Sequence, residues 1–358
     1  MPRELRAGER RVALVPDAVR RLRDAGLDVT VESGAGSHAF TTDDDYLGAG
    51  ARVVDGDVLT DADVVVTVAP LTLDQAARLR PGAITIGFLP VGAETELVSA
   101  LRAKQVLAFA MEAVPRLSRA QSMDALSSQA LVAGYRCALV AATHLPRFFP
   151  LFMTSAGTVA PAKVLVIGAG VAGLQAIATA RRLGAVVEAY DVRSSSADEV
   201  RSMGATFVDL GLEALEGAGG YAREMTEDRA VRQRELLTPY VEASDAVICT
   251  AAVPGRAAPL LLTGEMVGTM RPGSVVVDLA AESGGNCELS RPGEVLDHGG
   301  VTVWGAKDVA SSMPVHASQL YARNVTSLLL LMTKDGEVVP DFDDEIVATA
   351  CVTREGPA

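Results

Sequence analysis

Three glycines with the spacing G-x-G-x-x-G follow a short apolar run at residues 164–167. They are Gly168, Gly170 and Gly173, with Ala169 and Val171 between them, and a helical pattern follows. The first glycine permits a tight turn, the second lets a pyrophosphate approach the backbone, and the third lets the helix pack against the strand. Free N–H groups at the start of that helix would face the phosphates. The spacing therefore predicts a dinucleotide-binding turn; the alternative is a glycine-rich turn without a ligand.

An acidic residue at the end of the next apolar run supports this prediction. Asp191 lies 18 residues after Gly173, where the second strand of such a fold should finish. A carboxylate there accepts hydrogen bonds from the adenosine ribose and repels a 2′-phosphate, which favours NAD(H) over NADP(H). Val192 and Arg193 follow and are assigned to the same site. Arg193 could reach a 2′-phosphate, although we favour a solvated residue at the entry to a helix.

Two small residues follow a later apolar run, at residues 246–249. Ala251 and Ala252 stand where a nucleotide would lie close to the backbone, beyond the carboxyl end of a strand. We assign them as floor contacts of the nucleotide site. Ordinary tight packing explains their small size equally well.

Composition excludes several other classes of function. The 358 residues include 32 Lys and Arg against 45 Asp and Glu, and the formal net charge of −13 would repel a nucleic acid. Because 49% of the residues are hydrophobic, intrinsic disorder is excluded as well. The cysteines and histidines are too dispersed to indicate a metal site or a redox pair. Neither a signal peptide nor an uninterrupted apolar span is visible in the stretches 148–162 and 164–180, so we expect a cytoplasmic chain without a membrane span.

Strand-like and helix-like segments alternate along the chain, which predicts an α/β fold with parallel sheets. We expect two Rossmann-like domains, linked by long helices near residues 123–145 and 320–332. The first domain should comprise residues 1–128 and 309–358, and the dinucleotide-binding domain residues 129–308. Expected strands of the first domain are 12–15, 29–32, 64–68, 83–88 and 106–110. Those of the second are 164–167, 186–190, 206–208, 246–249, 275–279 and 301–304.

Four segments carry a resemblance to a known family. They read PRLSRAQSMDALSSQA at 115–130, PLFMTSAGTV at 150–159, GGYAREM at 219–225 and GGNCE at 284–288. With these, the chain resembles the NAD(H)-binding alpha component of proton-translocating, Re/Si-specific NAD(P) transhydrogenase, in the alanine dehydrogenase/transhydrogenase family. The similarity runs from Arg6 to Arg354. It implies hydride transfer between NADH and NADP(H) held on a partner subunit.

The resemblance implies roles for the loop at residues 116–127. Arg116 and Ser127 match positions that contact the nicotinamide carboxamide, and Gln121 matches one that bonds the nicotinamide ribose and the incoming NADP nucleotide. Asp124 matches a position that helps to orient Arg116 and the ring. Amide and hydroxyl groups are poor proton shuttles but suit a carboxamide, and hydride exchange requires no general acid or base. The alternative is an exposed polar loop without a ligand.

A second implied element is a lid at residues 217–235, in which Gly220, Tyr221 and Met225 would fold over bound nucleotide. Its alternative is a disordered surface loop. The family further implies a homodimer, an NADP-binding beta component and a membrane-spanning subunit. Because the chain ends at Ala358 without spanning helices, we expect them on other polypeptides, with this chain peripheral to the inner face of the cell membrane.

Two departures from the family pattern bear on the alternatives. The chain begins near the end of the family's usual first strand, so that N-terminal strand is expected to be missing. Thr67 stands where relatives often place a lysine, and neither it nor the run 84–90 supplies the Lys and His that hold and protonate an oxo acid in alanine dehydrogenases. This opposes an alanine-dehydrogenase-like oxidoreductase. A non-catalytic NAD-binding regulator would not require the loop at 116–127.

Overall fold

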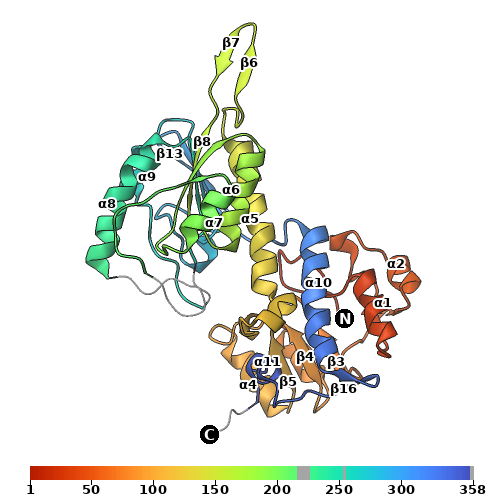
Figure 1. Cartoon of the computed structure of the whole chain (residues 1–358). Helices are drawn as coiled ribbons and strands as arrows, with labels where there is room; N and C mark the ends of the chain where they lie inside the picture. The colour runs from red at the N-terminus through yellow and green to blue at the C-terminus, as the bar shows by residue number, and fades with distance from the viewer. Residues whose placement is uncertain (216–225, 253–254, 355–358) are drawn as a thin grey trace. The chain divides into compact units, whose positions relative to one another are not determined.

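The computed structural model describes residues 1–215, 226–252 and 255–354, and the chain divides into two compact α/β units. The first unit comprises Met1–Gln129 and Ala310–Ala358, and the second comprises Ala130–Val309. Helix α5 (Ala125–His144) begins in the first unit and continues in the second. Figure 1 shows both units and labels their elements.

The second unit is built on a seven-stranded sheet with the order β10-β9-β8-β11-β12-β14-β13. Its first six strands are paired in parallel, in the 3-2-1-4-5-6 order of a doubly wound nucleotide-binding fold. The chain order reverses between β8 and β11, where such folds bind their ligands. These strands are β8 (Lys163–Ile167), β9 (Val186–Tyr190), β10 (Thr206–Phe207), β11 (Ala246–Cys249), β12 (Val275–Asp278), β13 (Val295–His298) and β14 (Val301–Gly305).

Apolar side chains on both faces of this sheet are covered by helices. Val164 and Val166 of β8 pack with α5 and α6 (Val171–Arg182), whereas Leu165 and Ile167 pack with α8 (Glu227–Ala243) and α9 (Gly264–Gly268). Successive side chains of a strand point to opposite faces, so a strand covered on both sides is apolar throughout. Helices α6 and α7 (Ser196–Ser202) lie on one side of the sheet and α8 and α9 on the other (Figure 1).

The first unit holds two small parallel sheets. One pairs β1 (Thr30–Glu32) with β2 (Arg52–Val54), and the other has the order β3-β4-β5, with β3 (Val64–Val66), β4 (Ile84–Gly87) and β5 (Leu107–Ala110). The Met1 amino group donates to the carbonyl of Thr30, and the Glu32 N–H donates to that of Met1, so the first residues lie beside β1. The helices are α1 (Pro16–Asp24), α2 (Asp43–Gly48), α3 (Leu73–Arg78), α4 (Thr95–Ala103), α10 (Pro314–Leu331) and α11 (Glu345–Ala350).

The expected strand at residues 12–15 is wrong, because this buried segment forms no ladder. Its backbone groups are bonded by side chains instead: the Val12 N–H donates to Oγ of Ser318, and the Tyr46 hydroxyl donates to the carbonyl of Leu14. Strands β2, β13 and the hairpin of β6 (Phe152–Thr154) with β7 (Gly157–Val159) were not expected. That hairpin projects from the sheet of the second unit (Figure 1). A further short hairpin pairs β15 (Thr333–Lys334) with β16 (Glu337–Val338).

Helix α5 is long and apolar enough to cross a membrane, and no other helix in the described ranges is; half of its apolar window is buried. Length and composition alone do not separate such a helix from the core helix of a water-soluble fold. Within the second unit, a Cβ added at Gly134 would lie only 2.0 Å from the carbonyl oxygen of Ala172. Helix α5 therefore packs backbone to backbone on the start of α6, as a core helix does.

Candidate functional site

The glycine turn joins β8 to α6 at the point where the strand order reverses. Gly168 has a φ of +97°, and a Cβ there would come within 2.8 Å of the backbone nitrogen of Ala251. A Cβ at Gly173 would meet the carbonyl oxygen of Gly168 at 1.8 Å. Gly170 differs, because a Cβ there would meet nothing within 4 Å. Packing therefore requires the outer two glycines, and the middle one leaves open space beside the backbone, which suits a pyrophosphate.

Asp191 lies directly after β9, beside the glycine turn. Its Oδ2 accepts a hydrogen bond from the backbone N–H of Ala169 at 2.7 Å. It also forms a bidentate ion pair with Arg193, whose Nε and Nη2 atoms each lie 2.9 Å from one carboxylate oxygen. The structure thus brings the predicted acidic partner to the predicted turn. Arg193, expected to be solvated, is mostly buried by this pair.

The loop after β11 contacts the glycine turn from the neighbouring strand. Thr250 Oγ1 donates to the carbonyl of Gly168 at 2.9 Å, and the backbone of Ala251 lies against Gly168. Ala251 is partly buried and Ala252 is exposed. The small residues assigned as floor contacts therefore border the turn. Residues 253 and 254 lie outside the described ranges.

Sequence reasoning missed the residue that supports this loop, Asn286. Its side-chain amide donates to the carbonyls of Ala251 and Pro259, both at 2.8 Å, and its Oδ1 accepts from the N–H of Ala251 at 3.1 Å. Asn286 is fully buried. The GGNCE segment was visible in the sequence, but its contact with a loop 35 residues earlier was not.

Asp278, at the end of β12, is a second supporting residue that sequence reasoning missed. Its fully buried carboxylate accepts hydrogen bonds from the N–H groups of Ala280 and Cys287 at 2.9 Å and from Ser290 Oγ at 2.5 Å. Burial raises the pKa of Asp278, and these hydrogen bonds offset only part of that effect. The carboxylate organises the turn that carries Asn286.

The loop at residues 116–127 belongs to the first unit, where Ser118–Met123 form a 3-10 helix. Arg116 and Gln121 are exposed. Asp124 accepts hydrogen bonds from the backbone N–H of Ser127 at 2.8 Å and from its hydroxyl at 2.6 Å, so it caps the start of α5. Two of the four predicted site residues are therefore in direct contact.

This loop is anchored to α10 and α11 by residues that sequence reasoning missed. Asn324 of α10 donates to the carbonyl of Ser122 at 2.8 Å and accepts from the hydroxyl of Ser128 at 2.7 Å. Arg119 forms a bidentate pair with Asp344, at 2.7 and 2.9 Å. The part of the chain after residue 310 thus positions a loop that precedes it by about 200 residues.

The expected lid falls largely on residues that the structure does not describe. Gly220, Tyr221 and Met225 all lie outside the described residues. The charged helical stretch expected after them is present as α8, from Glu227 to Ala243.

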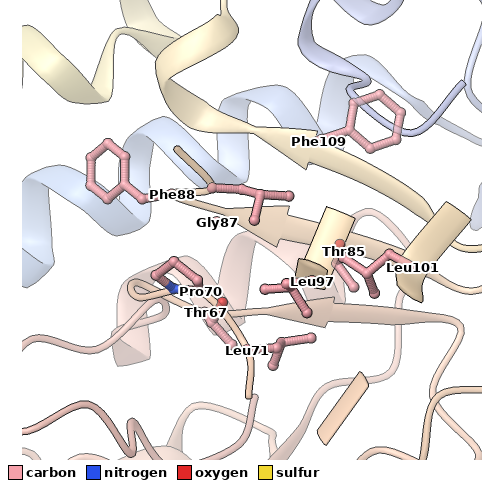
Figure 2. Close-up of a pocket in the computed structure, with 10 residues that line it drawn as sticks. Thr67, Pro70, Leu71, Thr85, Gly87, Phe88, Leu97, Leu101 and Phe109 are labelled. Carbon is pink, nitrogen blue, oxygen red and sulfur yellow. The ribbon is translucent and has the colours of Figure 1, made fainter. Parts of the chain in front are cut away.

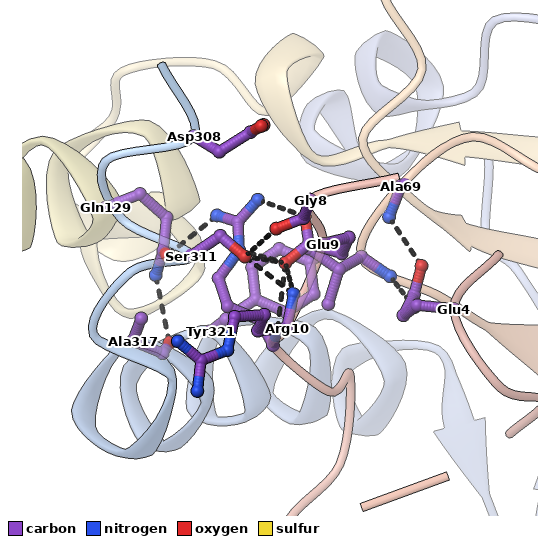
Figure 3. A network of polar contacts seen from close by, with 12 residues as sticks. Glu4, Gly8, Glu9, Arg10, Ala69, Gln129, Asp308, Ser311, Ala317 and Tyr321 are labelled. Carbon is purple, nitrogen blue, oxygen red and sulfur yellow. Dashed lines mark hydrogen bonds and ion pairs between the residues drawn. The ribbon is translucent and has the colours of Figure 1, made fainter. Parts of the chain in front are cut away.

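The surroundings of Thr67 bear on an oxo-acid site. A cavity of about 20 Å³, room for a single water, lies beside it, and none of its lining residues is ionisable (Figure 2). The buried cation Arg11 is engaged by both carboxylate oxygens of Glu9, at 2.6 and 2.8 Å, and by Gln129 at 2.9 Å (Figure 3). Burial would raise the pKa of Glu9, but the hydrogen bonds and charge of Arg11 outweigh it and lower that pKa.

Fold and site together define a Rossmann-type α/β protein of two units with a dinucleotide-type glycine turn. The chain belongs to the alanine dehydrogenase/PNT family, whose N-terminal domain matches residues 1–133 and whose C-terminal domain matches residues 137–358. It is 46% identical to the first of the polypeptides that make up NAD(P) transhydrogenase subunit alpha in Rhodospirillum rubrum, over 99% of this chain and 96% of that protein. It is thus similar to an oxidoreductase component, and NAD(H) binding fits that similarity.

Two further relatives delimit the family. A solved structure of transhydrogenase from Sinorhizobium meliloti superposes with a TM-score of 0.88 at 42% identity, covering 98% of this chain and 96% of that one. Alanine dehydrogenase of Mycolicibacterium smegmatis is 32% identical over 82% of this chain and 74% of its own length.

Proposed function

We propose that this chain is the NAD(H)-binding component of a proton-translocating NAD(P) transhydrogenase. NADH, when bound, supplies the hydride that reduces NADP⁺ held on a separate component. The observation that carries the proposal is the hydrogen bond between Asp191 and Ala169, which joins a ribose acceptor to the glycine turn. The names of the relatives support the reaction and the need for a partner component.

The second unit would hold the nucleotide through three groups of residues. The turn at residues 168–173 would receive the pyrophosphate, Asp191 the adenosine ribose, and the loop with Ala251 and Ala252 the floor of the site. The lid with Gly220, Tyr221 and Met225 remains part of the proposal.

The loop of the first unit would bind and orient the nicotinamide. Arg116 and Ser127 would contact the carboxamide, and Gln121 would bond the nicotinamide ribose and the incoming NADP nucleotide. Asp124 acts as a positioning residue, since its two hydrogen bonds hold Ser127. Direct hydride exchange requires two rings at near-attack distance with water excluded, and no proton transfer by these side chains.

The alternative of an alanine-dehydrogenase-like enzyme is less well supported. Reductive amination needs a cation for the substrate carboxylate and a proton-transfer group. The cavity beside Thr67 has no ionisable lining, and Arg11 is already paired with Glu9. We expect no oxidation of NADH by the chain with pyruvate and ammonia; such turnover would favour the alternative. A non-catalytic NAD-binding regulator would show neither reaction.

We further propose a homodimer in which the β6–β7 hairpin packs against a second copy. The hairpin and its base expose apolar side chains, with Met153 78% and Phe148 57% accessible. An isolated two-stranded hairpin is only marginally stable in water, so a covering surface is favoured. The variant Met153→Lys should weaken the dimer in sedimentation experiments, whereas an unchanged assembly state would argue against this surface.

The remaining partners follow from the same proposal. A beta component would carry NADP(H), a membrane-spanning subunit would conduct protons, and this chain would lie at the cytoplasmic face of the membrane. The names of relatives as alpha subunits support the existence of a partner subunit.

NADH titration of the variant Asp191→Ala tests the nucleotide site. Loss of a charged hydrogen-bond acceptor should cost about 1.5–3 kcal/mol of NADH affinity. The variant Asp198→Ala is a matched control, because Asp198 is an exposed carboxylate on the following helix, where it pairs with Arg201. An unchanged affinity in Asp191→Ala would refute the assignment of Asp191.

A further inference from the structure

Asp191, the expected acceptor for the adenosine ribose, already has a full set of donors within the second unit. Its Oδ1 accepts from the backbone N–H and the Nε of Arg193, both at 2.9 Å. Its Oδ2 accepts from the Ala169 N–H at 2.7 Å and from Nη2 of Arg193 at 2.9 Å. An ionised carboxylate offers about four lone-pair positions, so a ribose hydroxyl can bond it well only if a donor leaves.

The donors differ in how easily they can leave. The N–H of Ala169 is held by the glycine turn, and the N–H of Arg193 lies in the turn that follows β9. Moving either would require the backbone of the site to rearrange. The guanidinium stands at the end of a flexible side chain that is still 17% exposed, against 7% for the carboxylate. It is therefore the donor that can leave without disturbing the fold.

We propose that the Arg193 guanidinium is a displaceable latch on Asp191, which the ribose hydroxyls of NADH must replace. This inference rests on the proposed NAD(H) site and adds a residue that sets its affinity and selectivity. A latch that is closed about nine-tenths of the time lowers the apparent affinity about tenfold. Arg193 therefore opposes NADH binding, although it lies in the binding site.

The latch has the opposite effect on a nucleotide that carries a 2′-phosphate. Once released from Asp191, the guanidinium remains tethered two residues away, at the same end of the site. It can then pair with a 2′-phosphate, which the carboxylate alone repels. Arg193 thus narrows the preference for NADH over NADPH from both sides. A residue with a merely structural role would move both affinities in the same direction.

The test compares NADH and NADPH titrations of the full chain with those of Arg193→Ala, Asp191→Ala and the double variant. Arg193→Ala should bind NADH up to about tenfold tighter, because Asp191 is then open, and should bind NADPH more weakly. In the Asp191→Ala background, removal of Arg193 should bring no gain for NADH. Arg201→Ala is the matched control, since it removes an arginine from an exposed ion pair on the next helix and should change neither affinity.

The outcomes separate this proposal from the one beneath it. A tighter NADH complex cannot result from damage to the fold, so a gain supports the latch directly. Unchanged or weaker NADH binding in Arg193→Ala overturns the latch and leaves the nucleotide site standing. No NADH binding by the unaltered chain overturns both proposals.

Discussion

The side chain of Asn286 pairs with the backbone of Ala251 as a neighbouring strand would, donating to its carbonyl and accepting from its N–H. This amide closes the edge of the loop after β11, where the parallel ladder has ended. Because Ala251 in turn lies against Gly168, the position of the glycine turn depends on a side chain from a different loop. Asp278 holds the turn from which Asn286 projects.

The variant Asn286→Ala should therefore weaken NADH binding and lower thermal stability together. It leaves the N–H and carbonyl of Ala251 without their partner, at about 1–3 kcal/mol for each group that stays buried. Asn286→Asp is the matched comparison, since it keeps the acceptor and loses both donated hydrogen bonds. NADH titration and thermal unfolding of both variants provide the measurement. Wild-type affinity in Asn286→Ala would show that the loop does not depend on this amide.

The variant Gln121→Asn should slow hydride exchange much more than it weakens NADH binding. Gln121 is exposed on the loop of the first unit, so the change costs little stability. Shortening the side chain alters the positioning of the reacting rings, an effect that falls on the transition state. Parallel measurement of the exchange rate and of NADH affinity separates the two effects. Equal losses in both would contradict the role assigned to Gln121.

The variant Glu4→Gln should change how stability depends on pH. Burial raises the pKa of Glu4 to about 7, although the N–H groups of Val68 and Ala69 oppose this by bonding its carboxylate. Between the unfolded pKa and about 7 the folded state holds the extra proton, so this group makes stability fall as pH rises through that window.

A glutamine at position 4 removes that titration. The stability of Glu4→Gln relative to the unaltered chain should rise from about pH 5 to about pH 7, by at most about 1.4 kcal/mol per pH unit. Urea unfolding at several pH values measures it. Parallel pH profiles for the two proteins would show that Glu4 does not titrate in this window.

Local patterns predicted the nucleotide turn well, because its glycines and the strand before it follow one another in the sequence. Asp191 was predictable for the same reason, since strand and helix lengths set its distance from Gly173. The segment at residues 12–15 was misjudged because its backbone partners, such as Ser318, lie about 300 residues away. Asn286, Asp278 and Asn324 were missed because their roles exist only in tertiary contacts.

One missed element did leave a readable signal. Strand β13 pairs antiparallel with β14 across the two-residue turn Gly299-Gly300, and both glycines have positive φ. Such a pair of glycines between strands indicates a tight hairpin. The short run at 295–298, with only two apolar residues, hid the strand itself.

Direct hydride exchange tests the central claim most directly. The chain is mixed with a purified NADP-binding component, NADPH and an acetylated NAD analogue, and reduction of the analogue is followed by absorbance. We expect reduction only when both proteins are present, since each would hold one of the two reacting nucleotides. Absence of exchange with a partner component that is active with another alpha subunit would contradict the account.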